Sequence, residues 1–536
     1  MKNKNYNQHS NDLSSLSKEE LISLLLKAEA ATSAAESKIQ EAEDKAKMFQ
    51  EQYELLLEKM KLATKHKFGS KSETAHALQM SLFNEIEEAA LDTEESLPLD
   101  ILIDLHNHSK KRKARKPSTA VVLDIVDVIH DIEEEDKEGY ILCGEKTREE
   151  LCYQPAKYYV KMHRYPVYKR ELEDGTTDFR SADGFQPLIA NSYVSGELAA
   201  HIMYDKYQRG MPLYRLEHDF LMHDIAISRQ TMANWCMRLS EDYFSILVER
   251  MKIHLLQKDI IHSDDTSVKV IHHQDGSENQ KSTMWVYCSG QFDVPILLYE
   301  YQPDRKSEHP KEYLSNFHGY LCSDGYQGYD KVEGVTRVGC LAHARRKFTD
   351  ALAGYGKNNT SESKRLLEDI LKRFSHIFHI DKQLSELELE AKQAERMAKL
   401  KPVMEELKQK LTALDGSILR KSKFGEAITY TLNQFPLLEN VFLDPRLELT
   451  NNRAERQVKP FVMGRKAWLF SNTTRGAKCS ADIYSMVQTA KENQLKVPAY
   501  LAYVLEETRG KTITDVKQFD YLLPYSKDLP DSLRMK

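Results

Sequence analysis

Residues 451–478, which read NNRAERQVKPFVMGRKAWLFSNTTRGAK, concentrate side chains that could do chemistry. Their one acidic residue, Glu455, stands among many cations. A structural interpretation is a helix capped by Thr450 or Asn451, with Glu455 in its early turns, where the helix dipole favours an anion. A chemical interpretation is a metal-binding carboxylate among phosphate-binding cations, although the stretch alone favours the structural one. The cations are Arg453, Arg456, Lys459, Arg465, Lys466, Arg475 and Lys478.

Two aspartates upstream change that balance. Asp264 interrupts a strand-like run at 259–272 (DIIHSDDTSVKVIH), and Asp324 follows another such run at 319–323 (GYLCS). Because carboxylates are poor strand formers, we expect Asp264 to have a functional role. Asp324 with Gly325 could also be no more than a turn signal.

These carboxylates need a scaffold, and the sequence around them predicts a mixed sheet with helices on its faces. Before Glu455, residues 346–444 predict a helical insertion whose apolar residues recur at helical spacing and form its core. One charged helix of the insertion is expected over roughly 382–400, ending before Pro402. The strand candidates are 259–272, 284–289, 295–301, 319–323 and 337–341, the last of which runs into a basic helix.

The N-terminal part of the chain predicts an elongated element. Residues 13–66 lack proline and glycine, and their apolar residues alternate at four- and three-residue spacing, as in a coiled-coil seam. We expect self-association through this helix; the alternative is a helix folded back on its own chain. Residues 67–118 predict a short helix and a basic linker. The linker is either a solvated segment or an arm that contacts phosphates through Lys110, Lys111, Arg112 and Lys113.

Residues 119–197 alternate β-rich runs with polar turns, which predicts a small β-containing module. Cys143 and Cys152 are its cysteines, and their spacing does not supply the four ligands of a structural zinc site. We therefore expect no metal in this module.

Residues 198–245 predict helices that break near Asp224 and restart at Ser228, a favourable N-cap. This pattern indicates a helix-turn-helix-like pair. Two helices that simply pack on the protein are the commoner arrangement and the alternative. If the pair reads DNA, the exposed face of its second helix presents Arg229, Gln230 and Asn234.

Composition limits the class of protein. The chain has 536 residues, of which 41% are hydrophobic and 29% charged, and a net charge of −6, so nucleic-acid binding must come from local patches. No apolar run approaches the roughly 20 residues of a membrane span, and the N-terminus lacks the apolar core of a secretion signal. The seven scattered cysteines fit a reducing compartment. We expect a cytoplasmic protein without membrane association.

Short sequence motifs identify a protein family more specifically than any single residue type does. The stretches HSDDTSVKV, CSDGYQGYDKV, GCLAHARRKF, NNRAERQVKPFVMGRKAWLF and the ending YLLPYS resemble the transposases of the insertion-sequence-66 family. The resemblance covers nearly the whole chain, including the N-terminal helix and the helical insertion. It implies a multidomain α/β protein with a ribonuclease-H-like mixed sheet built from 250–345 and 445–492, followed by a C-terminal element at 493–536.

The resemblance also implies chemistry. It makes the chain a DDE-type polynucleotidyl transferase in which Asp264, Asp324 and Glu455 are catalytic and hold a pair of Mg²⁺ ions, for which Mn²⁺ can substitute. Water would first free a 3′-hydroxyl at the element end, and that hydroxyl would then attack target DNA. Besides the helix pair and the basic run, the expected DNA contacts are Arg345, Arg346, Lys347, Arg453, Arg456, Lys459, Arg465 and Lys466.

Four positions carry narrower expectations. Trp468 either stacks on a base or belongs to the core. His343 is expected either beside the metal ligands or in contact with a phosphate, and not as a metal ligand. Asp265 stands where many family members have Glu, and we expect it to lie next to the ligands. The family usually carries a cysteine-pair zinc module near 140–175, of which this chain keeps only Cys143 with its glycine, so no zinc is expected.

The expected partners are DNA, both element ends and target, together with further copies of the chain and accessory proteins encoded by the same element. The expected location is the bacterial cytoplasm, at the nucleoid. Two alternatives stay open: a ribonuclease-H-like nuclease without strand transfer, and a non-catalytic DNA-binding protein derived from a transposase. The intact acids argue against the second, and the predicted coiled coil and helix pair favour a transposase over a nuclease, because transposition holds two DNA ends together.

Overall fold

The chain divides into two compact units in the computed structural model, Met1–Ala63 with Phe185–Lys536 and Thr64–Gly184. The structure describes separate helical positions between Lys18 and Gln40, and then residues 158–164, 167–171, 177–180, 186–273, 276, 281–355, 360–511 and 516–535.

Several predicted features fall wholly or largely outside these residues. The basic run from Lys110 to Lys113, the short helix before it and the cysteines Cys143 and Cys152 all lie there. The described positions of the N-terminal helix are helical and exposed, with Ile39 59% exposed. The coiled-coil seam itself stays a prediction. Among the described residues, no helix combines the length and apolar character needed to cross a bilayer.

The Thr64–Gly184 unit contains a β-hairpin pairing. Strand β1 (Tyr168–Glu171) pairs antiparallel with β2 (Thr177–Arg180), with Tyr168 opposite Arg180. These strands lie within the segment in which the sequence predicts β structure.

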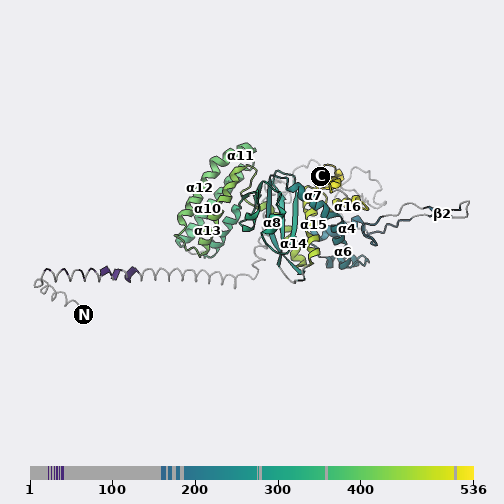
Figure 1. Cartoon of the computed structure of the whole chain (residues 1–536), viewed down its shortest axis with the longest axis horizontal. Coiled ribbons are helices and arrows are strands. Elements are labelled where there is room, and N and C mark those ends of the chain that lie inside the picture. The colour runs from purple at the N-terminus through teal and green to yellow at the C-terminus, as the bar shows by residue number, and fades with distance from the viewer. Residues whose placement is uncertain are drawn as a thin grey trace, which may run out of the picture. The chain divides into compact units, whose positions relative to one another are not determined.

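The larger unit is built on a mixed sheet (Figure 1). Its strand order is β5-β4-β3-β6-β7: β4 is antiparallel to both β5 and β3, whereas β6 and β7 run parallel to β3. A further strand, β8, pairs in parallel with the far end of β3. The bounds are β3 Ile260–His272, β4 Lys281–Ser289, β5 Leu297–Gln302, β6 Tyr320–Cys322, β7 Thr336–Val338 and β8 Ser471–Thr473.

The sheet confirms the predicted strand regions and corrects three details. Asp264 does not interrupt its strand, because β3 continues through it and pairs Asp264 with Val286 of β4. The flanking apolar residues and the long β4 partner override the weak strand preference of the carboxylates. Leu341, predicted as the end of a strand, begins helix α9 instead. Strand β8 has no apolar alternation and was not predicted.

Helices before the sheet include the predicted pair. Helix α5 ends at Leu221, Asp224 adopts a positive φ of 59°, and α6 begins after Ser228, whose Oγ accepts the N–H of Thr231 at 3.1 Å. The predicted break and N-cap are therefore confirmed. The bounds are α4 Gly196–Tyr207, α5 Leu213–Leu221, α6 Arg229–Leu239 and α7 Ser245–Leu255, with a π-helical turn at Ser240–Phe244.

Helix α15 (Thr474–Glu492) covers the edge strand β5 with side-chain hydrogen bonds. The Oγ of Ser485 accepts the N–H of Tyr299 at 2.8 Å, and the Oγ1 of Thr489 accepts the N–H of Leu297 at 3.0 Å. Backbone donors of an edge strand are thereby satisfied within the chain. Beyond α15 lie α16 (Val497–Thr508) and short 3₁₀ turns at Val516–Leu522 and Asp531–Leu533.

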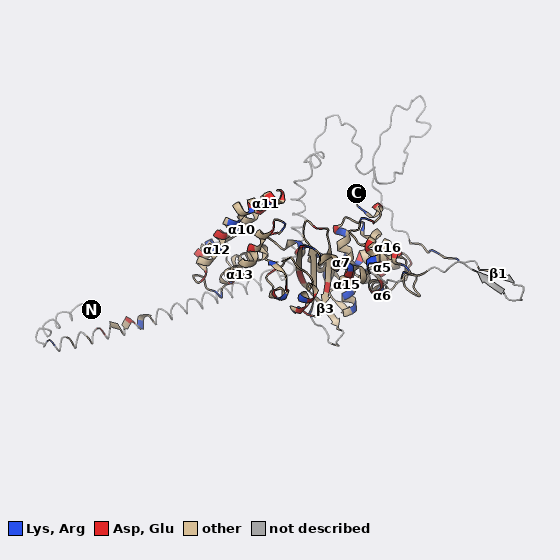
Figure 2. Cartoon of the chain, turned by 45° about the horizontal axis from the view of Figure 1, so that its top comes forward, with Lys and Arg blue, Asp and Glu red and all other residues tan. Residues whose placement is uncertain are grey.

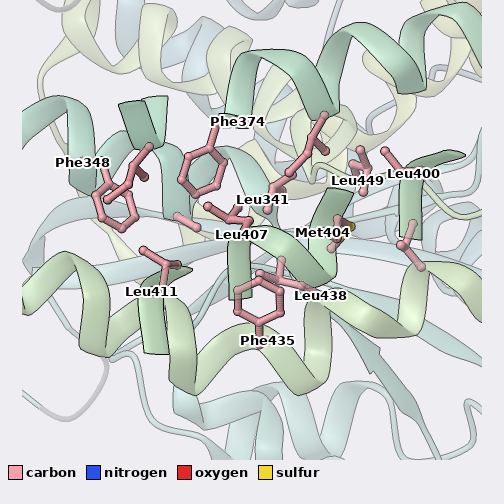
Figure 3. Packing of buried hydrophobic residues seen from close by; sticks show 14 of the residues in the cluster. Leu341, Phe348, Phe374, Leu400, Met404, Leu407, Leu411, Phe435, Leu438 and Leu449 are labelled. Carbon is pink, nitrogen blue, oxygen red and sulfur yellow. The ribbon is translucent and has the colours of Figure 1, made fainter. Parts of the chain in front are cut away.

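The predicted insertion is helical, and its core is continuous with the sheet (Figure 3). Leu341 and Phe348 of α9 meet Phe374, Leu407 and the other labelled residues, and the same cluster includes the sheet residues Ile260, Cys322 and Val338. Figure 2 shows residues of both charge signs along these helices. The bounds are α8 Glu308–Tyr313, α9 Leu341–Ala353, α10 Glu362–Leu384, α11 Leu389–Glu395, α12 Lys401–Leu414 and α13 Lys423–Leu438.

The helix expected over 382–400 is wrong at both ends. Helix α10 ends at Leu384, and a new helical segment starts at Leu389. That segment does not stop before Pro402, because a π-helical turn at Arg396–Leu400 joins α11 to α12, where Pro402 occupies the first turn. Proline is tolerated at that place because the first-turn N–H groups have no partner within their own helix.

Candidate functional site

The three predicted acids come from separate elements. Asp264 lies within β3, and Asp324 follows β6, the parallel neighbour of β3. Because His262 pairs with Cys322, the two aspartates stand at matching positions two residues further along. Glu455 lies in the first turn of α14 (Asn452–Trp468), which packs on β3 and β4. The fold therefore brings the three acids together.

The electrostatics of Asp264 reflect this convergence. Burial and the neighbouring carboxylates of Asp324, Glu455 and Asp265 raise the pKa of Asp264 to about 8. The backbone N–H of Asp265 donates to Asp264 Oδ1 at 2.8 Å and offsets this effect in part. Without a cation, the site therefore keeps a proton on Asp264 at neutral pH, because burial and neighbouring acids disfavour its charged form.

Glu455 is oriented by α9, the helix that carries the GCLAHARRKF motif. The Nη2 of Arg346 donates to Glu455 Oε2 at 3.3 Å, and His343 Nδ1 lies 3.6 Å from Glu455 Oε1. Both of these facing atoms, His343 Nδ1 and Glu455 Oε1, are buried without a hydrogen-bond partner among the described residues. Burial lowers the pKa of His343 despite the nearby carboxylate. A carboxylate oxygen with no donor, beside two aspartates, suits a hard divalent cation such as Mg²⁺.

Asn451 ties the start of α14 to β3. Its Nδ2 donates to the carbonyl oxygen of Ser263 at 2.8 Å, which directs Oδ1 towards Nδ1 of the buried His262, 3.1 Å away. The N–H of Asn451 donates to Cys340 Sγ at 3.2 Å. Asn451, one of the two residues predicted as the cap, occupies the N-cap position, but its side chain bonds to the neighbouring strand and does not cap the helix. The backbone beside Asp264 and the helix bearing Glu455 are held together through one amide.

The turn after β6 positions Asp324. The buried Arg337 donates through Nη2 to the carbonyl oxygen of Asp324 at 2.9 Å and to Ser323 Oγ at 3.1 Å. A Cβ at Gly325 would lie 2.5 Å from the hydroxyl oxygen of Tyr430, so this position requires glycine for a close approach rather than for the turn alone.

Asp265 has its own partner. Arg305 donates through Nε to Oδ2 at 2.9 Å and through Nη2 to Oδ1 at 2.7 Å, and its guanidinium lies over the ring of Tyr326. Burial raises the pKa of Asp265, whereas Arg305 lowers it. Asp265 therefore lies next to the acid cluster as a paired charge.

A second donor set overlaps the acid cluster. Ligand atoms of Cys340, His343 and Glu455 all lie within 4.8 Å of one another, a spacing that could hold a metal ion. Burial raises the pKa of the Cys340 thiol to about 11, and its sulfur already accepts the N–H of Asn451. A neutral thiol is a poor ligand, so the three carboxylates fit a cation better than this set.

The predicted DNA-contacting cations fall into two groups. Arg453 and Arg465 make internal bonds: Arg453 Nε donates to the carbonyl oxygen of Ser289 at 2.6 Å, and Arg465 Nη1 donates to the Thr266 hydroxyl at 3.2 Å. Arg475, which is not among the predicted DNA contacts, is held by Glu241 in a two-bond ion pair at 2.5 and 2.6 Å. The other group is exposed to solvent and comprises Arg345, Arg346, Lys347, Arg456, Lys459, Lys466 and Arg229. The predicted neutral contacts Gln230 and Asn234 are exposed on α6 as well.

Trp468 belongs with the packed side chains. Its ring meets Phe461 edge to face at 5.7 Å and is only partly exposed. The aromatic residue on the surface at this end of α14 is Phe470, which is 44% exposed. Of the two interpretations of Trp468, the structure favours the core.

The family model described as "Transposase IS66 family" matches residues 191–479, which is more than half of the chain's 536 residues. The chain belongs to this family of transposases. A second model, "Transposase C of IS166 homeodomain", matches residues 55–121, which the structure does not describe. The first match includes the segments that bear all three acids.

Three relatives come from Sinorhizobium fredii and are named as uncharacterized proteins. The protein y4hP is 28% identical over 351 residues, which is 62% of each chain, so the alignment spans less than two thirds of its length. The protein y4qI is 26% identical over 408 residues, 72% of each chain. The protein y4jD is 27% identical over 401 residues, 72% of this chain and 75% of its own.

Proposed function

We propose that the chain is a DNA transposase that cleaves the ends of its insertion sequence and joins them to target DNA, with Asp264, Asp324 and Glu455 as its catalytic carboxylates. The observation that carries the proposal is the convergence of these acids from β3, the end of β6 and the start of α14. Burial, together with the neighbouring carboxylates, raises the pKa of Asp264 to about 8, which also supports the proposal.

The sheet supports a ribonuclease-H-like core. Its order β5-β4-β3-β6-β7, with an antiparallel meander followed by parallel strands, places an acid on the central strand β3 and another at the end of its parallel neighbour β6. The central strands of such sheets, and the loops that follow their ends, are favourable positions for an active site because several elements converge there. The third acid, Glu455, lies on α14, the helix that follows the insertion. The three acids therefore stand in the D, D, E order of the family.

The donor set fits Mg²⁺, with Mn²⁺ as a substitute, because it consists of carboxylate oxygens, the hard ligands that these cations prefer. When bound, a pair of such ions activates the attacking oxygen and stabilises the leaving oxygen of a displacement at phosphorus. Asp264 must lose its proton to take part, and its raised pKa means that the cation and the proton compete for this carboxylate.

The surrounding residues orient the acids. Arg346 holds Glu455 from α9, Asn451 fixes the start of α14, and Arg337 fixes the backbone of Asp324. Positioning of this kind is what makes a displacement effectively intramolecular once the phosphodiester is bound.

Exposed cations supply the DNA contacts. Those on α9 and α14 flank the acid cluster, and contacts with phosphates from these helices would make binding strongly dependent on salt. The exposure of polar residues on α6 supports a role of this helix in reading bases, like that of the second helix of a helix-turn-helix. Self-association through the N-terminal helix would allow two element ends to be held together.

The test is a cleavage and joining assay with the full chain, a duplex carrying the element's own end, target plasmid, and Mg²⁺ or Mn²⁺. Wild type is compared with Asp264→Asn, Asp324→Asn and Glu455→Gln, and with Asp350→Asn, an exposed acid on α9, as the matched control. Joined products from wild type and the control alone are expected. Cleavage without joining would indicate a nuclease, and activity that persists in Glu455→Gln would refute that residue as the third acid.

A further inference from the structure

A cavity of about 340 Å³ opens where the outer part of β3 meets the end of α14. Ser267 and Lys269 line it from β3, Lys281 from β4, Arg465 from α14, and Leu469 from the turn directly after that helix. At roughly 3.3 Å per residue, the β3 residues of the cavity lie about 10 to 17 Å along the strand from Asp264.

The cations of this cavity form no ion pair with a carboxylate in the part of the chain that the structure describes. Lys269 and Lys281 stand directly opposite each other in the β3–β4 register, an arrangement in which like charges repel. Arg465 donates only to the hydroxyls of Thr266 and Ser267, at 3.2 and 3.4 Å, and its burial lowers the pKa of the guanidinium. Among the described residues, none of the three cations forms an ion pair. An anion bound between them would remove this repulsion.

A strained turn borders the same cavity. Leu469 has φ 66° and ψ −45°, and the N–H of Phe470 donates to the carbonyl oxygen of Trp468 at 2.9 Å. This is the rare γ-turn with a positive φ, which a branched residue such as leucine adopts only at a cost. The turn leaves Leu469 68% exposed beside the cations. Strain that holds an apolar side chain in solvent points to a contact made when a ligand binds.

The position of the cavity narrows the identity of that ligand. Lys281 lies opposite Lys269, which stands on the same strand as Asp264, so the cavity and the acid cluster share β3. Cations for phosphate and an adjoining apolar side chain for sugar match a nucleotide unit of DNA. Along a duplex, with about 3.4 Å per nucleotide of one strand, 10 to 17 Å corresponds to roughly three to five nucleotides.

We propose that Lys269, Lys281 and Arg465 bind one backbone phosphate of the DNA, about three to five nucleotides from the phosphodiester at the acid cluster, with Leu469 packed on the adjoining sugar. This cavity is termed the phosphate cradle. The proposal rests on the proposed function, since it assumes that DNA is the substrate of the acid cluster, and it adds two lysines that the sequence did not single out.

The test measures DNA binding by the full chain in EDTA, so that cleavage does not intervene. The probe is a fluorescein-labelled duplex carrying the element end, titrated at several salt concentrations. Lys269→Ala/Lys281→Ala is compared with Lys372→Ala/Lys421→Ala, which removes the same charge from exposed positions of the insertion. The cradle variant should bind about tenfold more weakly, as expected for loss of charge-assisted hydrogen bonds. Its salt dependence should also fall by about 0.9 in slope, the value for one phosphate contact, while the control matches wild type.

A second arm locates the contact. Neutral methylphosphonate linkages are placed one at a time along each strand of the probe. One linkage about three to five nucleotides from the cleavage position should weaken wild type but leave the Lys269→Ala/Lys281→Ala variant unchanged. Leu469→Gly should relax the turn, keep or raise the unfolding temperature, and still weaken binding.

Each outcome bears on the proposal. Equal affinity and equal salt slope for the cradle variant and wild type would overturn it, as would indifference of wild type to every linkage in that window. Binding by Leu469→Gly equal to wild type would remove Leu469 from the contact. A wild-type chain that binds no DNA would refute the proposed function itself, which separates that failure from failure of the cradle.

Discussion

Replacing Asp264 with asparagine tests whether the charged form of this carboxyl is destabilised by burial and by the neighbouring acids. Asparagine keeps the shape of the side chain but removes its charge. The pKa of Asp264 is raised from 3.8 to about 8 in the fold. A pKa raised in the folded state contributes stability that is fully present below the unfolded value and is lost as pH rises towards the folded value. At about 1.36 kcal/mol per pKa unit, wild type should lose roughly 4 kcal/mol relative to Asp264→Asn between about pH 5 and pH 8.

The measurement is urea unfolding of both proteins in EDTA at the two pH values, with Asp350→Asn as a control for a surface acid. The variant should be the more stable protein at the higher pH, and added Mg²⁺ should stabilise wild type there far more than the variant, because a ligand that binds the folded state shifts the equilibrium. Parallel pH dependences for wild type and Asp264→Asn would show that this carboxyl is not buried among other acids.

The other predictions concern packing around the site. Asn451→Ala should destabilise the chain by about 2 to 3 kcal/mol, because it removes two buried hydrogen bonds and leaves Nδ1 of His262 without its partner; thermal unfolding measures this. Gly464→Ala should cost about 1 to 3 kcal/mol, since a Cβ there would lie 2.1 Å from the hydroxyl oxygen of Tyr484, and Tyr484→Phe in the same chain should recover much of the loss. Leu469→Gly should stabilise the chain by about 1 kcal/mol in urea unfolding, and a loss of stability would show that the turn is not strained.

The sequence predicted those parts of the fold that depend on local pattern. The strand regions, the N-cap at Ser228 and the helical insertion follow from periodicity and capping chemistry, and all appear in the structure. The local patterns also singled out Asp264, an acid within a strand-like run, and Glu455, an acid among cations. The fold brings these two acids together. Their catalytic role stays a proposal.

Features that depend on pairing between distant segments could not be predicted. The side chain of Asn451 was expected to cap its own helix, whereas it bonds to β3, because only the folded sheet brings the carbonyl of Ser263 within reach. The opposition of Lys269 and Lys281 depends on the register of β3 with β4. The helix through Pro402 depends on a π-helical turn that no proline rule anticipates.

The continuous core between sheet and insertion has a consequence for folding. Ile260, Cys322 and Val338 share one apolar cluster with Phe374, Leu407 and their neighbours, so neither side has a complete hydrophobic surface of its own (Figure 3). Two groups of elements that share their buried surface melt together rather than in separate steps. The residues between the second and third acids therefore form part of the cooperative unit that stabilises the acid cluster, and excising them would expose the apolar ends of the strands that carry it.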